Sequence, residues 1–533
     1  LLRERGYYCS NNSKEDYTLA KPGTVWDESS GRAHWRNRGK DQPFFAIFNF
    51  TTTHESQIRK RPHAAVHDPA KAPVPAYHPD TPEVRQDWAQ YYDNIATMDG
   101  QAGKVLAQLQ EDGLADDTIV FFYGDHGSGM PRSKRWPYDS GLHVALIVHV
   151  PEKFRDLAPA DYKPGGTTGR LVGFVDFAPT LVSLAGAKPP DWMQGRAFLG
   201  AHAAPPAKFQ HGFRGRMDER YDLVRSVTDG RYVYLRQYMP HLPYGQHIDY
   251  MFQTPTTRLW KEMYDAGKLK PPQTHFWEPK PAEELYDLQS DPDETRNLAG
   301  SPDHRAVLET LRKAQRDHAL AIRDVGLLSE AEFHRRAAAA GVSIYEFGHD
   351  AAKYPLERIL DMADLATLRQ PDAGGKLKEG LKDPDSGVRY WAAMGFLVRG
   401  AEAVAGARDE LAAALKDESP TVRVTAARAL GEHGGEAGLA LALPVLRDHA
   451  SPVENGAYLA ILALNAIDAL GPKAASLKET VRALPLQDPK AAGRANGYVA
   501  RLVQTITGDA PADKPARPRP KKGRPAAGAA GGT

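Results

Sequence analysis

An internal repeat with a period of 34 residues most strongly constrains how the C-terminal part of the chain can fold. The segment LKEGLKDPDSGVRYWAAMGFL (377–397) matches LAAALKDESPTVRVTAARAL (411–430), and a weaker third copy follows. The Asp, Val-Arg and Ala-Ala positions keep register, so that Asp383 and Asp417 are 34 positions apart. Each copy is predicted to form a helix, an Asp-containing turn and a second helix, and such units bury their apolar faces only against their neighbours. The pattern favours stacked helical repeats over 371–508, with a plain helical bundle as the alternative.

A second informative stretch, IVFFYGDHG (119–127), is an apolar run that ends in Asp125 and His126 between two glycines. The carboxyl ends of strands in α/β sheets are where binding sites lie. Carboxylate and imidazole are ligands of divalent cations, and glycines let backbone or substrate come close. Taken alone, the pair is explained as readily by a capped strand end with a surface histidine.

The order of apolar segments predicts the fold class of the first 300 residues. FFAIFNF (44–50) has strand character, 84–110 has helical periodicity, and two further apolar runs flank a polar loop at 124–143. This alternation indicates an α/β domain with a mostly parallel sheet covered by helices. Within 205–300, Asp229-Gly230 separates two β-rich runs and predicts a hairpin in a small α+β subdomain.

Composition divides the chain further and excludes several partners. The 533 residues carry a net charge of +1, which provides no overall field for nucleic acid or a membrane surface. No apolar run reaches the about 20 residues of a membrane-spanning helix. Cys9 is the one cysteine, so no internal disulfide can form. The predicted parts are an α/β core, an α+β subdomain, a helical linker region, helical repeats and a disordered basic tail, at 1–204, 205–300, 301–370, 371–508 and 509–533.

The residues after Asp125 give the first resemblance to a known family. Lys134 follows Asp125 by nine positions, Tyr138 follows Lys134 by four, and a second apolar run comes next. This spacing resembles the metal-and-lysine segment of the sulfatases in the alkaline-phosphatase superfamily, which usually reads Lys-x-x-x-Tyr-Glu-Gly-Gly-x-Arg. The chain departs from that pattern at Asp139, Ser140 and His143.

Other segments resemble the family in the same order, over about residues 1–300. FFAIFNFTTTHES resembles the strand that ends in an active-site histidine, here His54, and GYYCSNNSKEDY resembles a segment with a functional lysine, here Lys14. Asp16 stands where the family often has histidine. The segment PVPAYHPDTPEVRQDWAQYYDNIATMDG is most similar to the heparan N-sulfatase (sulfamidase) branch and its bacterial relatives. The C-terminal repeats resemble HEAT-type repeats.

The resemblance implies a metal-dependent formylglycine mechanism acting on a sulfated sugar. Asp125 and His126 would be metal ligands, Lys14 and Lys134 would bind sulfate oxygens, and His54 would be the general acid. Ca²⁺ is the first expectation for the cation, and His126 leaves Mn²⁺ or Zn²⁺ open because imidazole suits softer ions. It also implies a periplasmic or secreted protein.

The chain contains neither the Cys/Ser-x-Pro-x-Arg nucleophile motif of the family nor, near its N-terminus, the family's Asp-Asp metal pair. The expectation is therefore that formylglycine belongs to a missing segment ahead of Lys14 and that the 533 residues alone are inactive. Two alternatives stay open: a phosphoester or phosphonate hydrolase of the same superfamily, and a non-catalytic protein that binds a protein partner through its repeats.

A second cationic cluster lies in GFRGRMDERYD, where Arg214 and Arg216 are candidates for binding a substrate carboxylate or sulfate group. Ion pairs with Asp218 and Glu219 are an equally good interpretation of this cluster.

Overall fold

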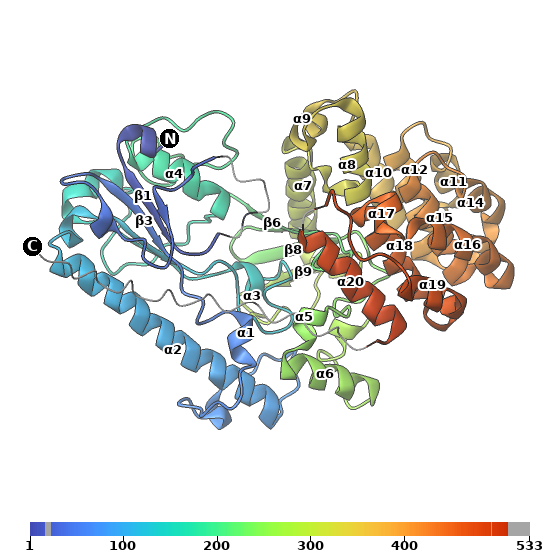
Figure 1. Cartoon of the computed structure of the whole chain (residues 1–533), viewed down its shortest axis with the longest axis horizontal. Helices are drawn as coiled ribbons and strands as arrows, with labels where there is room; N and C mark the ends of the chain where they lie inside the picture. The colour runs from blue at the N-terminus through green and yellow to red at the C-terminus, as the bar shows by residue number, and fades with distance from the viewer. Residues whose placement is uncertain (16, 18–22, 492, 510–533) are drawn as a thin grey trace, which may run out of the picture.

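The computed structural model describes residues 1–15, 17, 23–491 and 493–509. Asp16 and almost all of the predicted basic tail therefore lie outside the described residues. The described part has three regions: an α/β region, a four-stranded antiparallel sheet in the middle, and a large helical region (Figure 1).

The α/β region contains two small sheets. β1 (Tyr8–Asn12) lies between β2 (Glu28–Ser29) and β3 (Phe44–Phe48), and both pairings are parallel, as predicted. β4 (Val120–Tyr123) pairs with β5 (Leu146–His149) in the antiparallel sense. The loop between them carries one short helix instead of the long crossover that parallel pairing needs, so the chain reverses direction.

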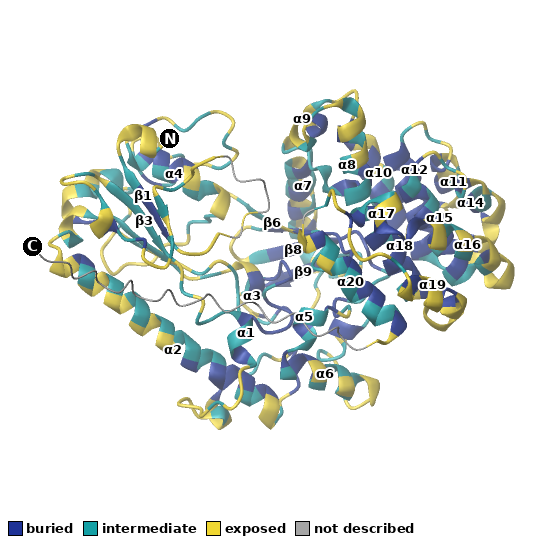
Figure 2. Cartoon of the chain, in the orientation of Figure 1, coloured by how far each residue is buried: buried dark blue, intermediate teal, exposed yellow. Residues whose placement is uncertain are grey.

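Apolar strands of this region are only partly buried by the described residues. The strand β3 is half-buried along its length, and the Tyr123 and Ile147 side chains of the β4–β5 pair are 38% and 61% exposed. A sheet of two strands cannot cover both of its own faces, and here α4 (Phe177–Leu184) packs Phe177 against Tyr123. Figure 2 shows the contrast with the helical region, where buried residues dominate.

Two helices, α1 and α2, follow β3 in the α/β region. α1 (Glu55–Ile58) is short, whereas α2 (Pro82–Glu111) covers the predicted helix 84–110 and begins with a Thr81 cap followed by proline. Their apolar faces meet in one cluster that includes Ile58, Val84, Trp88 and Met130. No helix in the described part of the chain is long and apolar enough to cross a membrane.

The central sheet has the order β6-β7-β8-β9 and is antiparallel throughout. Its strands are β6 (Gln210–Arg214), β7 (Val224–Thr228), β8 (Tyr232–Gln237) and β9 (Glu283–Asp287). The predicted hairpin turn joins β7 to β8, and Gly230 there has a φ of 97°, a conformation that favours glycine.

Side chains alternate between the two faces of this sheet. Val224, Leu235 and Tyr286 pack against Trp136 and Tyr138 of the loop that follows β4. Val227, Tyr234 and Leu285 point the other way and pack against Leu308 and Leu311 of α7 (Arg305–Ala321). The sheet therefore separates the loop after β4 from α7.

The helical region shares one continuous apolar core that runs from the linker helices through the repeats. Its helices are α8 (Glu330–Ala340), α9 (Ile344–His349), α10 (Leu356–Thr367), α11 (Gly374–Gly380), α12 (Ser386–Arg399), α13 (Ala401–Gly406), α14 (Arg408–Ala414), α15 (Pro420–His433), α16 (Gly435–His449), α17 (Pro452–Asn455), α18 (Ala457–Leu470), α19 (Lys478–Arg482) and α20 (Gly493–Thr507).

A polar contact between copies explains why arginine and aspartate keep the 34-residue spacing. Arg389 of one copy donates two hydrogen bonds, of 2.7 and 2.9 Å, to the Asp417 carboxylate of the next. Arg423, one repeat later, contacts His449 in the following copy. Each arginine thus fastens its own copy to its successor.

Candidate active site

The loop after β4 (124–143) is wound so tightly that it requires glycine at positions 127 and 141. The Gly127 amide donates to the Gly141 carbonyl at 2.9 Å, and a Cβ at Gly127 would lie 1.9 Å from the Ser140 carbonyl oxygen. A Cβ at Gly141 would lie 2.2 Å from the Trp136 carbonyl oxygen. The loop is anchored at Tyr138, whose buried hydroxyl donates to a Glu284 carboxylate oxygen at 2.8 Å.

Asp125 and His126 begin this loop and present two candidate metal ligands. The Nδ1–H group of His126 donates to the Gly127 carbonyl at 2.7 Å, which leaves the lone pair on Nε2 free to bind a cation. This Nε2 lies 3.7 Å from Asp125 Oδ1, a separation at which both atoms can contact one ion. Among the described residues there is no cluster of three or more His, Cys, Asp or Glu side chains that could hold a metal. The pair therefore fits part of a coordination shell.

His54 caps the N-terminus of α1 with its ring. The Ser56 amide donates to His54 Nδ1 at 3.2 Å, so the neutral ring carries its proton on Nε2. Burial lowers the pKa of His54, and the positive charges of Lys134 and Lys14 lower it further. Its ring centre lies 6.3 Å from that of Tyr250.

Two lysines approach the same place from different parts of the chain. Lys14 Nζ lies 4.0 Å from Asp125 Oδ2, and Lys134 Nζ lies 3.7 Å from Glu55 Oε1. Burial lowers the pKa of Lys134, and the Glu55 carboxylate partly offsets this. The structure thus brings together all of the residues predicted for catalysis and metal binding, which are Lys14, His54, Asp125, His126 and Lys134.

Sequence reasoning missed a buried ion pair beneath these residues. Arg135 donates from Nη1 and Nη2 to the two Glu55 oxygens at 2.7 and 2.9 Å, and both side chains are almost fully buried. Burial raises the pKa of Glu55, but the hydrogen bonds and charge of Arg135 outweigh it and hold the pKa below its ordinary value. A Cβ at Gly129 would lie 2.3 Å from the Glu55 Cβ, so the loop packs directly on this residue. The sequence contains one signal for this pair: Glu55 directly follows His54, and Arg135 directly follows Lys134.

The structure places Arg214 and Arg216, the predicted substrate-binding residues, in internal ion pairs. Arg214 is 1% exposed, pairs with Asp222 at 3.1 Å and donates to the Arg135 carbonyl. Arg216 donates hydrogen bonds from Nε and Nη2 to the two carboxylate oxygens of Glu330 in α8. Both guanidinium groups have internal partners, although Nη2 of Arg214 is buried without one. The ion-pair interpretation was right in kind, although these carboxylates are not the expected Asp218 and Glu219.

Comparison with known proteins shows which families the chain is similar to. Residues 4–187 match the sequence profile of the sulfatase family, and residues 374–465 match that of HEAT repeats. An ulvan-active sulfatase of Formosa agariphila is 41% identical over 368 residues, which cover 62% of this chain and 60% of that protein. A second ulvan-active sulfatase of this bacterium is 30% identical over 42% of each chain.

Human N-sulphoglucosamine sulphohydrolase is 27% identical over 46% of this chain and 50% of that protein. The chain thus spans between two fifths and three fifths of the length of these relatives. Its strand and helix order is that of a mixed α/β domain followed by helical repeats. Residues 4–187 are thus similar to the sulfatase family, and residues 374–465 are similar to HEAT repeats.

Proposed function

We propose that the protein hydrolyses sulfate esters of a sulfated polysaccharide. The observation that carries this proposal is the gathering of Lys14, Lys134 and His54 beside Asp125 and His126 within a sulfatase-family domain. Positive groups held next to a proton donor suit an anionic ester whose leaving oxygen gains negative charge.

The two lysines and the histidine have different tasks in this reaction. Lys14 and Lys134 bind oxygens of the sulfate group as point charges, and Glu55 holds the Lys134 ammonium in place. His54 gives a proton from Nε2 to the leaving oxygen. The charge of a bound sulfate group offsets that of Lys134, so it raises the pKa of His54 and favours the protonated ring.

Asp125 and His126 would hold a divalent cation, which would supply Lewis-acid stabilisation of negative charge on the sulfate group. Ca²⁺ is the proposed ion because carboxylate oxygen is its preferred ligand, and Mn²⁺ or Zn²⁺ are the alternatives that the imidazole admits.

We place the formylglycine nucleophile outside these 533 residues. The chain has no Cys/Ser-x-Pro-x-Arg motif. Cys9 lies buried in β1, and burial raises the pKa of its thiol to about 11, which leaves it unreactive.

The relatives suggest the substrate class. The two ulvan-active sulfatases favour ulvan as the polysaccharide. The human relative acts on N-sulphoglucosamine by its name, which makes an N-sulfated sugar the second candidate.

The test is release of inorganic sulfate by the protein expressed from its complete gene. Ulvan oligosaccharides, glucosamine N-sulfate, an aryl sulfate and the matching aryl phosphate are compared. The proposal expects sulfate release from ulvan oligosaccharides to exceed all other turnover, and residues 1–533 alone to be inactive. Faster turnover of the aryl phosphate would favour phosphoester hydrolysis, and no turnover of any substrate would favour a binding protein; either result overturns the proposal.

A further inference from the structure

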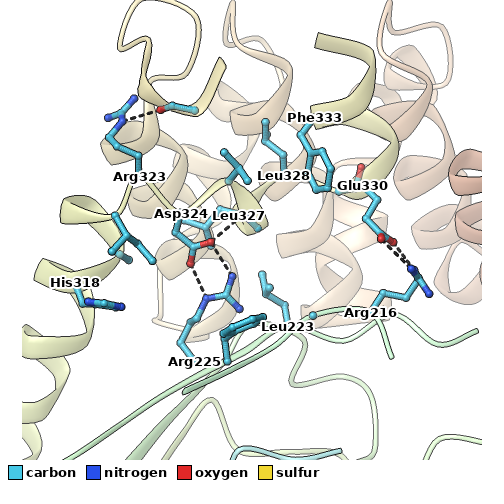
Figure 3. A pocket seen from close by; sticks show the side chains of 18 of the residues that line it. Arg216, Leu223, Arg225, His318, Arg323, Asp324, Leu327, Leu328, Glu330 and Phe333 are labelled. Atoms are coloured by element: carbon cyan, nitrogen blue, oxygen red, sulfur yellow. Dashed lines mark hydrogen bonds and ion pairs between the residues drawn. The ribbon is translucent and has the colours of Figure 1, made fainter. Parts of the chain in front are cut away.

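The connection between β6 and β7, residues 216–221, is held by the helical region. Figure 3 shows Arg216 reaching from this turn to Glu330 at the start of α8, across a cavity of about 620 Å³ between the sheet and the helices. Arg220 donates to the Asp468 carboxylate of α18 at 2.6 Å. Both contacts are well shielded, because the two arginines are 14% and 6% exposed.

Further contacts from α18 and α20 hold the middle of the same turn. Asn465 of α18 donates to the Glu219 carbonyl at 2.9 Å. Arg501 of α20 lies 3.4 Å from the Glu219 carboxylate and 3.7 Å from that of Asp218. It also lies 3.9 Å from the Asp249 carboxylate at the start of α5 (Asp249–Phe252), and Figure 1 shows α20 beside α5.

On its other side the turn contacts the candidate active site. Asp218 accepts a hydrogen bond of 3.2 Å from Nε of Arg135, whose remaining two nitrogens hold Glu55. Asp218 has a φ of 50°, an uncommon conformation for a residue other than glycine. The turn therefore holds this carboxylate in place against its local preference.

The Arg135 guanidinium is thus held between two carboxylates, those of Glu55 and Asp218. A planar group with five donors in fixed directions transmits the position of one partner to the other. Because Arg135 is 5% exposed, water cannot readily replace a lost partner. Loss of Asp218 would free the guanidinium to turn away from Glu55.

We propose that the helical region positions the active-site residues through the turn 216–221, with Asp218 as the positioning residue. The helices fix the turn, Asp218 orients Arg135, and Arg135 holds Glu55 between His54 and Lys134. The description of these side chains as an active site rests on the proposed function. The inference adds to that function a role for the repeats inside the enzyme, in addition to any partner they bind.

The test uses the variants Asp218→Asn and Arg501→Gln, with Arg501→Lys as the conservative rescue. Arg482→Gln is the matched control, because Arg482 lies on α19 in an exposed pair with Asp509. Hydrogen exchange of residues 128–137 and the NMR titration of the His54 ring are measured on each folded variant.

Asp218→Asn and Arg501→Gln should each speed exchange in 128–137 by about tenfold. They should also shift the His54 titration to higher pH, because Glu55 is then less neutralised by Arg135. Arg501→Lys should restore both readouts, and Arg482→Gln should change neither. Faster exchange confined to α20 and 216–221, with an unchanged His54 titration, would overturn the inference.

If Asp218→Asn does not fold, the partly exposed Arg501 carries the test by itself. Neither readout requires turnover, so their failure is distinguishable from failure of the sulfate-release assay.

Discussion

Glu55 and Arg135 lie 80 positions apart in the sequence and form a forked pair, with hydrogen bonds of 2.7 and 2.9 Å. Glu55 directly follows His54, and Arg135 directly follows Lys134. The pair therefore joins the segment that carries the candidate acid to the loop that carries the candidate sulfate-binding lysine.

Breaking this pair should destabilise the protein strongly. Glu55→Gln leaves the buried Arg135 without its main carboxylate, and removing one partner of a buried pair costs about 3 to 5 kcal/mol. Urea unfolding measures the loss. The control is Asp265→Asn, whose partner is Lys261 in an exposed helical pair and whose loss should cost about 0.5 kcal/mol or less. Equal effects of the two substitutions would contradict the assigned role of Glu55.

Removing the charge of Lys134 and removing that of Glu55 should shift the pKa of His54 in opposite directions. Lys134→Ala removes a positive charge that disfavours the imidazolium form, so the pKa of His54 should rise. Glu55→Gln removes a negative charge that favours the imidazolium form, so the pKa should fall below that of the wild type. NMR titration of the His54 ring gives both values. Shifts of the same sign in both variants would show that His54 does not lie between these charges.

The close packing of Gly129 on Glu55 can be tested with a single methyl group. Gly129→Ala should destabilise the protein by about 1 to 3 kcal/mol, because the new Cβ meets the Glu55 Cβ and Cα at 2.3 and 2.5 Å. Gly103→Ala is the control. It lies inside α2 with nothing within 4 Å of the new methyl group, and should stabilise the helix by up to about 1 kcal/mol. Thermal melting of both variants decides; a neutral Gly129→Ala would refute the packing argument.

The arginine contacts between repeats predict a further difference in stability. Arg389→Ala leaves the Asp417 carboxylate, which is 10% exposed, without its partner and should cost about 3 kcal/mol. Arg305→Ala, in an exposed helical pair with Glu309, should cost about 0.5 kcal/mol or less. Urea unfolding followed by circular dichroism compares them. A cost for Arg389→Ala as small as that of the control would mean that this contact does not stabilise the stack.

Local patterns made much of the site and fold predictable. Asp125, His126 and Lys134 lie within one loop, and the repeat helices show their period directly in the sequence. The partners of the arginines were not predictable. Arg216 pairs with Glu330, which is 114 positions away, and not with Asp218 or Glu219, which are close to it in the sequence. The antiparallel β4–β5 pairing also depends on how the loop between the strands folds, which its composition does not specify.

The sequence also did not predict which helices far apart along the chain pack against each other. Nothing in the repeat pattern shows that α20 returns to α5, where Arg501 lies 3.9 Å from Asp249. Such contacts depend on the summed curvature of many stacked helices and not on any one motif.

The most direct test of the proposed site is sulfate release from ulvan oligosaccharides by the protein expressed from its complete gene and by two lysine variants of it. Lys134→Ala should lower turnover by about 100-fold to 1,000-fold, because it removes a partly buried positive charge that the proposed function assigns to the sulfate oxygens. Lys153→Ala, which removes an exposed lysine paired with Asp117, should leave turnover unchanged. Wild-type turnover in Lys134→Ala would contradict the account.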